Sequence, residues 1–302
     1  LYTDMEKLIE IRKLPVLLLR MGNVMPDAVK TVAKELKGKT FDEVDVVLHT
    51  PGGHIESAYK IVKLIRKCSK KVNVIVPSFA KSAGTLICLA GENIILTTTS
   101  ELGPLDVQIP EQQEGDIETF KSALNGYKSL EQIQSHAVEN LDVATQLLIR
   151  RTGSRMRLQD IIKLAIQFSG NTSGCLYSQI HPKSIAEYAR ALDIGEQYGV
   201  KILTRFMKWS EEKAQIVIHR IVYDYPSHSF IIDSEELTEL GFSVIDAEGE
   251  VEVAIDELAS ELDMRNHSDE NEIKLFEAKK TNPEESSQTT NEKNETTTPK
   301  TK

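Results

Sequence analysis

The first hundred residues alternate short apolar runs with segments in which apolar residues recur at helical spacing. The apolar runs lie at residues 14–19, 44–48, 72–76 and 93–97, and the helical patterns lie at residues 25–36, 55–67 and 82–90. Short, nearly continuous apolar runs are typical of strands that are buried on both faces. This alternation predicts an α/β fold in which helices join parallel strands and cover both faces of one sheet.

From residue 111 the pattern changes to helical segments that are rich in charged and polar residues. Helical spacing is found at residues 117–124, 130–150, 156–166 and 182–207, with a polar loop expected at 169–174. We therefore expect a mostly helical region over residues 111–215. After it, Asp233 and Glu236 have the spacing of a capping box, which predicts a short helix before one more strand.

The end of the chain has a different composition. Its last part, "NPEESSQTTNEKNETTTPKTK", offers no apolar side chain for burial, and the preceding residues add only the short "IKLFEA". A segment that buries little apolar surface cannot offset the entropy lost on ordering. We expect a disordered polar tail over residues 266–302 and one folded domain over residues 1–265.

Overall charge and cysteine usage limit the classes of partner. The chain has 302 residues and a formal net charge of −10, which argues against a nucleic-acid-binding protein. Its three cysteines form no C-x-x-C pair, as is typical of a reducing compartment. No apolar stretch approaches the roughly 20 residues of a membrane span. We expect a cytoplasmic protein without a membrane span or bound nucleic acid.

Two glycine-containing turns each follow a predicted strand: "LHTPGG" at residues 48–53 and "AKSAGT" at residues 80–85. One interpretation is structural, because glycine permits positive φ in a tight turn and Ser82 is a favoured N-cap residue. The other is catalytic, because backbone N–H groups at such a turn can stabilise an oxyanion beside a nucleophile. Taken alone, the residue types leave both interpretations open.

Together, the two turns and the apolar helix behind Ser82 resemble the ClpP/crotonase fold. The most similar branch is the serine dehydrogenase (SDH) proteinase family, which is related to signal peptide peptidase A. "LGPLDVQ" at 102–108 and "SHSFIIDSEELTELGFSV" at 227–244 also resemble stretches of this family. The resemblance extends over about residues 5–244. It implies a spiral of mostly parallel strands with flanking helices, and a ClpP-like serine protease domain over residues 1–265.

The resemblance also implies roles for the residues of the two turns. Gly52 and Gly53 correspond to the family's oxyanion turn, and Ser82 corresponds to its nucleophile. The backbone N–H of Ala83 corresponds to the second oxyanion donor. A serine nucleophile beside two oxyanion donors implies a reaction in which an acyl group is transferred to the serine hydroxyl.

A serine nucleophile needs a base, and the chain offers histidine and lysine. ClpP carries its histidine shortly after the fourth strand, but "SELGPLDVQIP" contains none. His228 lies where the SDH family carries histidine, so we choose it as base, with Asp106 as the acid that orients it. A packing histidine and a turn aspartate remain the structural alternatives. Signal peptide peptidase A uses a Ser–Lys dyad, which makes Lys121 and Lys128 alternative bases.

The resemblance implies a serine endopeptidase that cleaves a peptide or protein substrate without a metal or organic cofactor. ClpP-fold proteins usually assemble, so we expect a homo-oligomer, with apolar stripes over 117–124 and 130–149 as candidate contacts. Two alternatives stay open. Crotonase-like proteins use the same glycine turn in acyl-CoA chemistry, and an inactive oligomeric scaffold would need Ser82 only as a helix cap.

Overall fold

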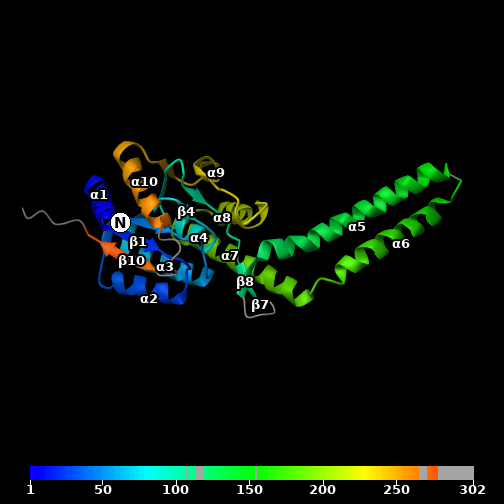
Figure 1. The fold of residues 1–302 in the computed structure, drawn as a ribbon, viewed down its shortest axis with the longest axis horizontal. Coiled ribbons are helices and arrows are strands. Elements are labelled where there is room, and N and C mark those ends of the chain that lie inside the picture. The colour runs from blue at the N-terminus through cyan, green and yellow to red at the C-terminus, as the bar shows by residue number, and fades with distance from the viewer. Residues whose placement is uncertain (107, 113–117, 154, 265–270, 278–302) are drawn as a thin grey trace, which may run out of the picture.

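In a computed structural model of the chain, the structure describes residues 1–106, 108–112, 118–153, 155–264 and 271–277. A six-stranded sheet in the order β10-β1-β2-β3-β5-β9 forms the centre of the main body (Figure 1). Its strands are β1 (Val16–Arg20), β2 (Phe41–His49), β3 (Ser69–Val76), β5 (Asn93–Leu96), β9 (Val244–Asp246) and β10 (Glu272–Phe276). Neighbours from β1 to β9 pair in parallel, whereas β10 joins the β1 edge antiparallel. The predicted α/β class with a mostly parallel sheet is confirmed.

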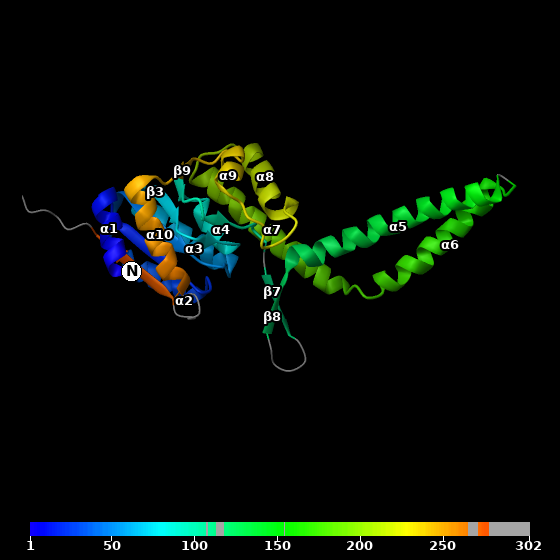
Figure 2. The same cartoon turned by 45° about the horizontal axis from the view of Figure 1, so that its top comes forward.

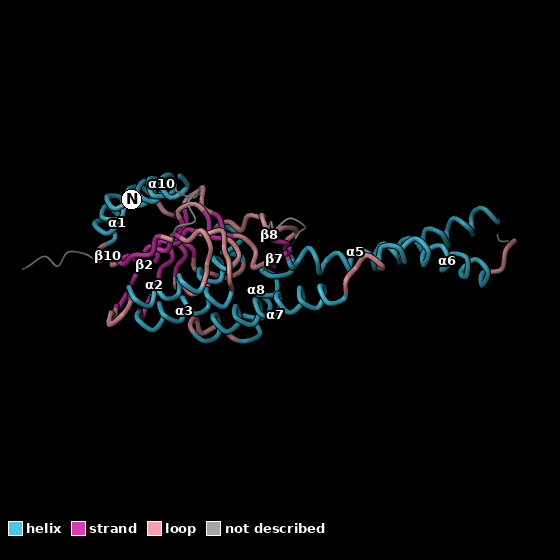
Figure 3. Tube along the Cα trace, turned by 60° about the horizontal axis from the view of Figure 1, so that its bottom comes forward, coloured by secondary structure: helices cyan, strands magenta, loops and turns pink. Residues whose placement is uncertain are grey.

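Helices cover both faces of this sheet (Figure 3). The helices of the main body are α1 (Tyr2–Arg12), α2 (Pro26–Glu35), α3 (Ile55–Cys68), α4 (Ala83–Cys88), α7 (Pro182–Arg205), α8 (Glu211–His219), the π-helix η1 (Arg220–Asp224), α9 (Ser234–Glu239) and α10 (Gly249–Met264). Leu17 and Leu19 of β1 pack in the larger cluster, with α2, α3 and α4. Val16 and Leu18 pack in a second cluster, with α1 and α10. Side chains that alternate along each strand therefore supply apolar surface to both helical layers.

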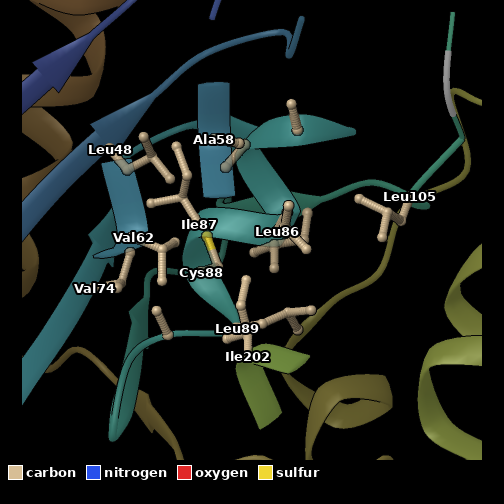
Figure 4. Packing of buried hydrophobic residues seen from close by; sticks show 14 of the residues in the cluster. Leu48, Ala58, Val62, Val74, Leu86, Ile87, Cys88, Leu89, Leu105 and Ile202 are labelled. Atoms are coloured by element: carbon tan, nitrogen blue, oxygen red, sulfur yellow. The ribbon is translucent and has the colours of Figure 1, made fainter. Parts of the chain in front are cut away.

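The short helix α4 lies entirely within the larger cluster, as its nearly uniform apolar sequence predicts (Figure 4). Its side chains Leu86, Ile87 and Cys88 are at most 1% exposed. Val62 of α3 and Ile202 of α7 belong to the same cluster. Burial raises the pKa of the Cys88 thiol far above its usual value, so this thiol stays neutral and serves in packing. A helix buried on all sides fixes the backbone that leads into it.

After β6 (Glu101–Leu102) the chain leaves the main body. The hairpin of β7 (Gln108–Gln112) and β8 (Glu118–Ser122) leads into α5 (Ala123–Thr152), and α6 (Leu158–Tyr177) returns beside α5. The pair α5–α6 projects well beyond the main body (Figure 2). The predicted helical region is confirmed in outline. The helix predicted at 117–124 is wrong, because residues 118–122 form β8 and pair with β7, and α5 begins only at Ala123.

The loop predicted at residues 169–174 is also wrong, because these residues lie inside α6. Ser169 and Ser173 are buried, and the Ser169 hydroxyl donates to the carbonyl of Ala137 in α5 at 2.6 Å. Small side chains at these positions let two helices approach closely. Tertiary packing thus overrides the loop preference of a segment rich in serine, glycine and asparagine.

Strand β10 lies inside the segment 266–302, which composition predicted to be disordered, so that prediction is wrong for residues 272–276. Ile273 and Leu275 pack against the larger cluster, and the Leu275 N–H donates to the Glu35 carboxylate at 3.0 Å. A five-residue edge strand gains its stability from a partner far away in the chain, which composition does not reveal. Residues 265–270 and 278–302 lie outside the described residues, and the predicted tail there stays a prediction.

We predict that removal of β10 destabilises the domain. A chain that ends at Asn271 loses the pairing with β1 and the contacts of Ile273 and Leu275, which should lower the free energy of unfolding by about 2 kcal/mol. For a domain of this size the melting temperature should fall by roughly 5 °C. A chain that ends at Glu277 is the matched control, because residues 278–302 contain no apolar residue larger than alanine or proline. Equal melting temperatures for the two chains, measured by calorimetry, would contradict the prediction.

Candidate active site

The turn after β2 and the turn before α4 lie against each other at the carboxyl ends of the parallel strands. Thr50 forms a parallel bridge with Ala80, and the Lys81 N–H donates to the Thr50 carbonyl at 3.0 Å. β4 (Phe79–Ala80) pairs with β6 as a small separate sheet beside them. The sequences "LHTPGG" and "AKSAGT" therefore form a single site, at the sheet edge where ligands bind in α/β folds.

Ser82 has a backbone conformation that residues other than glycine rarely adopt, with φ 49° and ψ −115°. Such a conformation costs on the order of 1–3 kcal/mol and persists only where the surroundings hold it. The side chain is 4% exposed, and its hydroxyl donates to the Asp106 carbonyl at 2.9 Å. It makes no hydrogen bond that caps α4. Ser82 occupies the N-cap position, but the interpretation of its hydroxyl as a cap is wrong.

The contact with Ser82 requires glycine at position 52. Gly52 has φ 119°, and a Cβ there would lie 2.9 Å from the Ser82 Cβ and 3.0 Å from the Lys81 carbonyl oxygen. Gly53 has φ 142°, and a Cβ there would lie 2.5 Å from the backbone nitrogen of Val24. Both glycines thus allow a backbone approach that a side chain would prevent.

The three predicted oxyanion residues differ in what their N–H groups contact. The Gly52 N–H donates to the hydroxyl of Thr50 at 3.2 Å and is already engaged. Within the part of the chain that the structure describes, neither the Gly53 N–H nor the Ala83 N–H donates to an acceptor. Ala83 begins α4, and the first N–H groups of a helix have no partner within it. Two backbone donors, one from each turn, therefore remain for a ligand.

Asp106 and His228 meet beside this turn. Asp106 is fully buried, and its Oδ1 accepts a hydrogen bond from the Leu124 N–H of α5 at 3.1 Å. Its Oδ2 lies 3.6 Å from Nδ1 of His228, and neither atom has a hydrogen-bond partner among the described residues. The His228 side chain is 24% exposed. The structure thus brings Ser82, Asp106 and His228 together, although the described residues contain no hydrogen bond between Ser82 and His228.

The segment that carries His228 is tied to the segment that carries the buried carboxylate. Leu102 and Ile232 exchange backbone hydrogen bonds of 3.0 and 2.9 Å. The Leu105 N–H donates to the Ile221 carbonyl of η1 at 3.1 Å. These bonds lie on both sides of His228 in the sequence, so they hold its ring beside the carboxylate. The sequence analysis did not predict them.

The two candidate lysine bases lie near the start of α5. Lys121 belongs to β8, and its side chain lies outside the described residues. Lys128 lies in the second turn of α5 and is half-buried. Its ammonium donates to the carbonyl of Tyr225 at 3.2 Å, three residues before His228. Lys128 is therefore hydrogen-bonded to the backbone of the segment that carries His228.

Other titratable neighbours of the two turns make structural contacts. The imidazole of His49 is buried, packs on the Phe79 ring and contacts the Asp263 carboxylate at 2.9 Å through Nε2. Burial lowers the pKa of His49, and the Asp263 contact only partly opposes this shift. The Lys81 ammonium lies 2.6 Å from the Glu101 carboxylate, an ion pair that the sequence analysis missed. Each of these groups therefore already has a partner on the protein.

The described residues offer neither a metal-binding cluster nor a membrane-spanning helix. They contain no cluster of three or more histidine, cysteine, aspartate or glutamate side chains that could hold a metal ion. No helix in the described part of the chain combines the length and the apolar character that crossing a membrane requires.

Residues 28–146 match the family model of the ClpP-like SDH-type serine proteinases. The matched segment contains both glycines, Ser82 and Asp106, and it ends inside α5, before His228. The resemblance to the SDH proteinases that the two turns predicted is thus confirmed, and it is a resemblance to serine peptidases at the level of the family. The roles predicted for Ser82, Asp106, His228 and the three oxyanion residues stay predictions, as does the relation to signal peptide peptidase A.

The chain is also similar to individual proteins. It is 42% identical over 66 residues to the uncharacterized protein MJ0137 and 35% identical over 74 residues to the uncharacterized protein MJ1495, both from Methanocaldococcus jannaschii. These alignments cover 22% and 24% of this chain and 23% and 25% of the relatives, so the chain spans about a quarter of the length of the curated relatives it matches. The solved structure of ClpP1 from Listeria monocytogenes is 14% identical, with a TM-score of 0.37, over 82% of this chain and 98% of that chain. We base nothing on a structural similarity this distant.

We predict that Gly52→Ala destabilises the domain more than Gly38→Ala does. Both glycines have positive φ, but a Cβ at Gly38 would meet no atom within 4 Å, whereas a Cβ at Gly52 would clash with Ser82 and Lys81. Backbone strain alone costs about 1–2 kcal/mol, and the clash should add roughly 2 kcal/mol for Gly52→Ala. Urea denaturation measures both losses. Equal losses would contradict the close approach of the two turns.

Proposed function

We propose that the chain is a serine peptidase in which Ser82 is the nucleophile, His228 is the base and Asp106 orients His228. The observation that carries the proposal is the strained backbone of Ser82, held between a buried helix and the backbone of Gly52. In hydrolases a strained turn of this kind presents the nucleophile at the end of a parallel sheet. The family resemblance of residues 28–146 supports the same class of reaction.

The proposed proton transfer follows from the orientation of the imidazole. Because Nδ1 of His228 faces the Asp106 carboxylate at 3.6 Å, Nε2 is left to accept the proton of Ser82. The Ser82 hydroxyl donates to the Asp106 carbonyl, so a rotation of its side chain has to bring Oγ to His228 before attack. With Oδ1 held by the Leu124 N–H, Oδ2 is free to stabilise the imidazolium that forms.

The proposed reaction proceeds through an acyl-enzyme. Ser82 Oγ bonds to the carbonyl carbon of the scissile peptide bond, and its proton passes to His228. The N–H groups of Gly53 and Ala83 donate to the oxyanion of the tetrahedral intermediate. The carbon–nitrogen bond then breaks, and His228 gives its proton to the leaving amine. A water molecule hydrolyses the Ser82 ester by the reverse sequence of proton transfers.

Two other functions are compatible with the same fold. In crotonase-like acyl-CoA chemistry the two N–H groups would hold a thioester oxyanion and Ser82 would not react, whereas an inactive scaffold would do neither. A fluorophosphonate probe separates these cases, because only an activated serine forms a covalent adduct. Binding of coenzyme A, measured by calorimetry, distinguishes the two alternatives if labelling is absent.

We predict that Ser82→Ala abolishes both probe labelling and peptide hydrolysis. His228→Ala should reduce hydrolysis nearly as much, and the double variant should be no worse than either single one, because residues that act as a unit are not additive. Ser82→Ala should lower the melting temperature by only a few degrees, since the hydroxyl caps no helix and alanine removes only its bond to the Asp106 carbonyl, which is worth about 1 kcal/mol. Hydrolysis that survives Ser82→Ala, assayed with a fluorogenic peptide, would end the peptidase proposal.

We also propose that Lys128 positions the His228 segment and is not the base. Lys128→Arg should keep most of the activity, because a guanidinium can donate to the Tyr225 carbonyl but cannot accept a proton at neutral pH. Lys128→Met should lower kcat by about tenfold, because loss of this contact loosens the segment. Loss of hydrolysis in Lys128→Arg with normal folding, or in Lys121→Arg, would assign the base to lysine.

We propose that a second copy of the chain covers the flank of α6. Leu164 and Phe168 lie four residues apart on one side of α6 and are 42% and 52% exposed, an apolar surface that a folded monomer leaves to water. This surface replaces the predicted contact at 117–124, which is not helical. Light scattering should give a mass well above 33.8 kDa, and serine at Leu164 and Phe168 should lower it without changing the melting temperature. A wild-type monomer at micromolar concentration would contradict the assembly.

A further inference from the structure

The far end of the α5–α6 hairpin is the part of the described chain most remote from the main body (Figures 1 and 2). α5 has 30 residues, which corresponds to a length of about 45 Å. We define the hairpin tip as residues 143–153 and 155–159 together with Ile162. The tip lies far from Ser82, so its role is separate from the proposed peptidase site.

The tip has a charge opposite to that of the chain as a whole. Residues 143–162 contain four arginines and one acidic residue, the exposed Asp160, which gives a formal charge of four minus one, or +3, whereas the whole chain has a formal net charge of −10. The side chains of Arg150, Arg151, Arg155 and Arg157 are all exposed. None of them forms an ion pair with another residue that the structure describes. The end of the hairpin therefore has an excess of positive charge that no ion pair among the described residues neutralises.

Exposed apolar side chains are interleaved with these arginines. Val143, Leu147 and Ile149 of α5 are 64%, 47% and 38% exposed, and Leu158 and Ile162 of α6 are 58% and 41% exposed. An isolated exposed apolar residue is ordinary, but here five of them lie in the two helix segments that meet at the end of one hairpin. Arginine beside leucine and isoleucine is the composition of segments that lie in a membrane interface.

We propose that the hairpin tip docks on an anionic lipid surface. The arginines would pair with acidic headgroups, and the apolar side chains would enter the boundary between headgroups and acyl chains. Charge fixes the orientation, because the acidic main body is repelled by the surface that attracts the tip. The main body would then be separated from the bilayer by a distance similar to the length of the hairpin.

The distribution of the apolar residues favours a lipid surface over a protein partner. Val143 and Leu147 differ by four residues and lie on one side of α5, whereas Ile149, six residues after Val143, lies about 120° around the helix from Val143. A protein partner covers one stripe of a helix, whereas a lipid interface surrounds the end of a hairpin. Leu164 and Phe168, proposed above as the contact with a second copy, lie nearer the main body along α6 and point to a different side of this helix from Ile162, so the two surfaces are distinct.

The test is co-sedimentation of the full chain with vesicles of phosphatidylcholine, with or without about 30% phosphatidylserine. The tip variant replaces Arg150, Arg151, Arg155 and Arg157 by glutamine. The matched control replaces the exposed Lys30, Lys34, Lys37 and Lys60 of the main body by glutamine, which changes net charge by the same amount. Because all eight side chains are exposed, both variants should keep the melting temperature of the wild type.

We expect the wild type and the control to bind only the anionic vesicles, more weakly as salt is raised. The tip variant should lose roughly several-hundred-fold in partition coefficient, since each basic residue near such a surface contributes about fivefold. In Leu158→Trp, the new indole should be quenched by brominated lipid, which confirms that the apolar tip enters the bilayer.

Three results would overturn the proposal. In the first, the wild type does not bind anionic vesicles. In the second, the tip variant and the lysine control lose binding equally. In the third, brominated lipid does not quench the indole of Leu158→Trp. A lower oligomeric mass in the tip variant, without vesicle binding by the wild type, would instead identify the tip as a contact between copies.

Discussion

The close approach of the Gly52 backbone to Ser82 is the constraint on which the rest of the site depends. Ser82 keeps an unfavourable conformation because the buried helix α4 holds it on one side and the turn after β2 holds it on the other. No side chain fits between these turns, so the close spacing of two neighbouring strand ends holds the backbone of Ser82 in its conformation. The stability of the apolar core thereby maintains local strain at the sheet edge.

The first two turns of α5 connect this edge with the projecting hairpin. The Leu124 N–H holds one oxygen of Asp106, and Lys128 holds the carbonyl of Tyr225 near His228. The same helix continues without interruption to the exposed tip. An element that contacts a surface at one end therefore orients charged groups of the site at the other. The helical region therefore both positions residues of the site and forms the projecting hairpin.

Much of the fold follows from local patterns. The first three apolar runs are buried strands and the runs of helical spacing between them are α2 and α3, because a sheet covered on both faces requires strands that are apolar throughout. The errors lie where a distant partner decides the structure. Residues 118–122 pair with β7, Ser169 bonds to α5, and β10 joins the β1 edge more than two hundred residues away. Local composition contains no signal for such pairings.

For the site, the sequence by itself determined the two glycine-containing turns, Ser82 before a buried helix, and the resemblance that pointed to Asp106 and His228. Only the tertiary structure decided that the Ser82 hydroxyl bonds to a carbonyl instead of capping α4, that one carboxylate oxygen faces the imidazole at 3.6 Å, and that Lys128 is engaged by the His228 segment. The physical reason is that turn formation and helix burial depend on neighbouring residues. The contacts among these side chains instead depend on how segments far apart in the chain pack together.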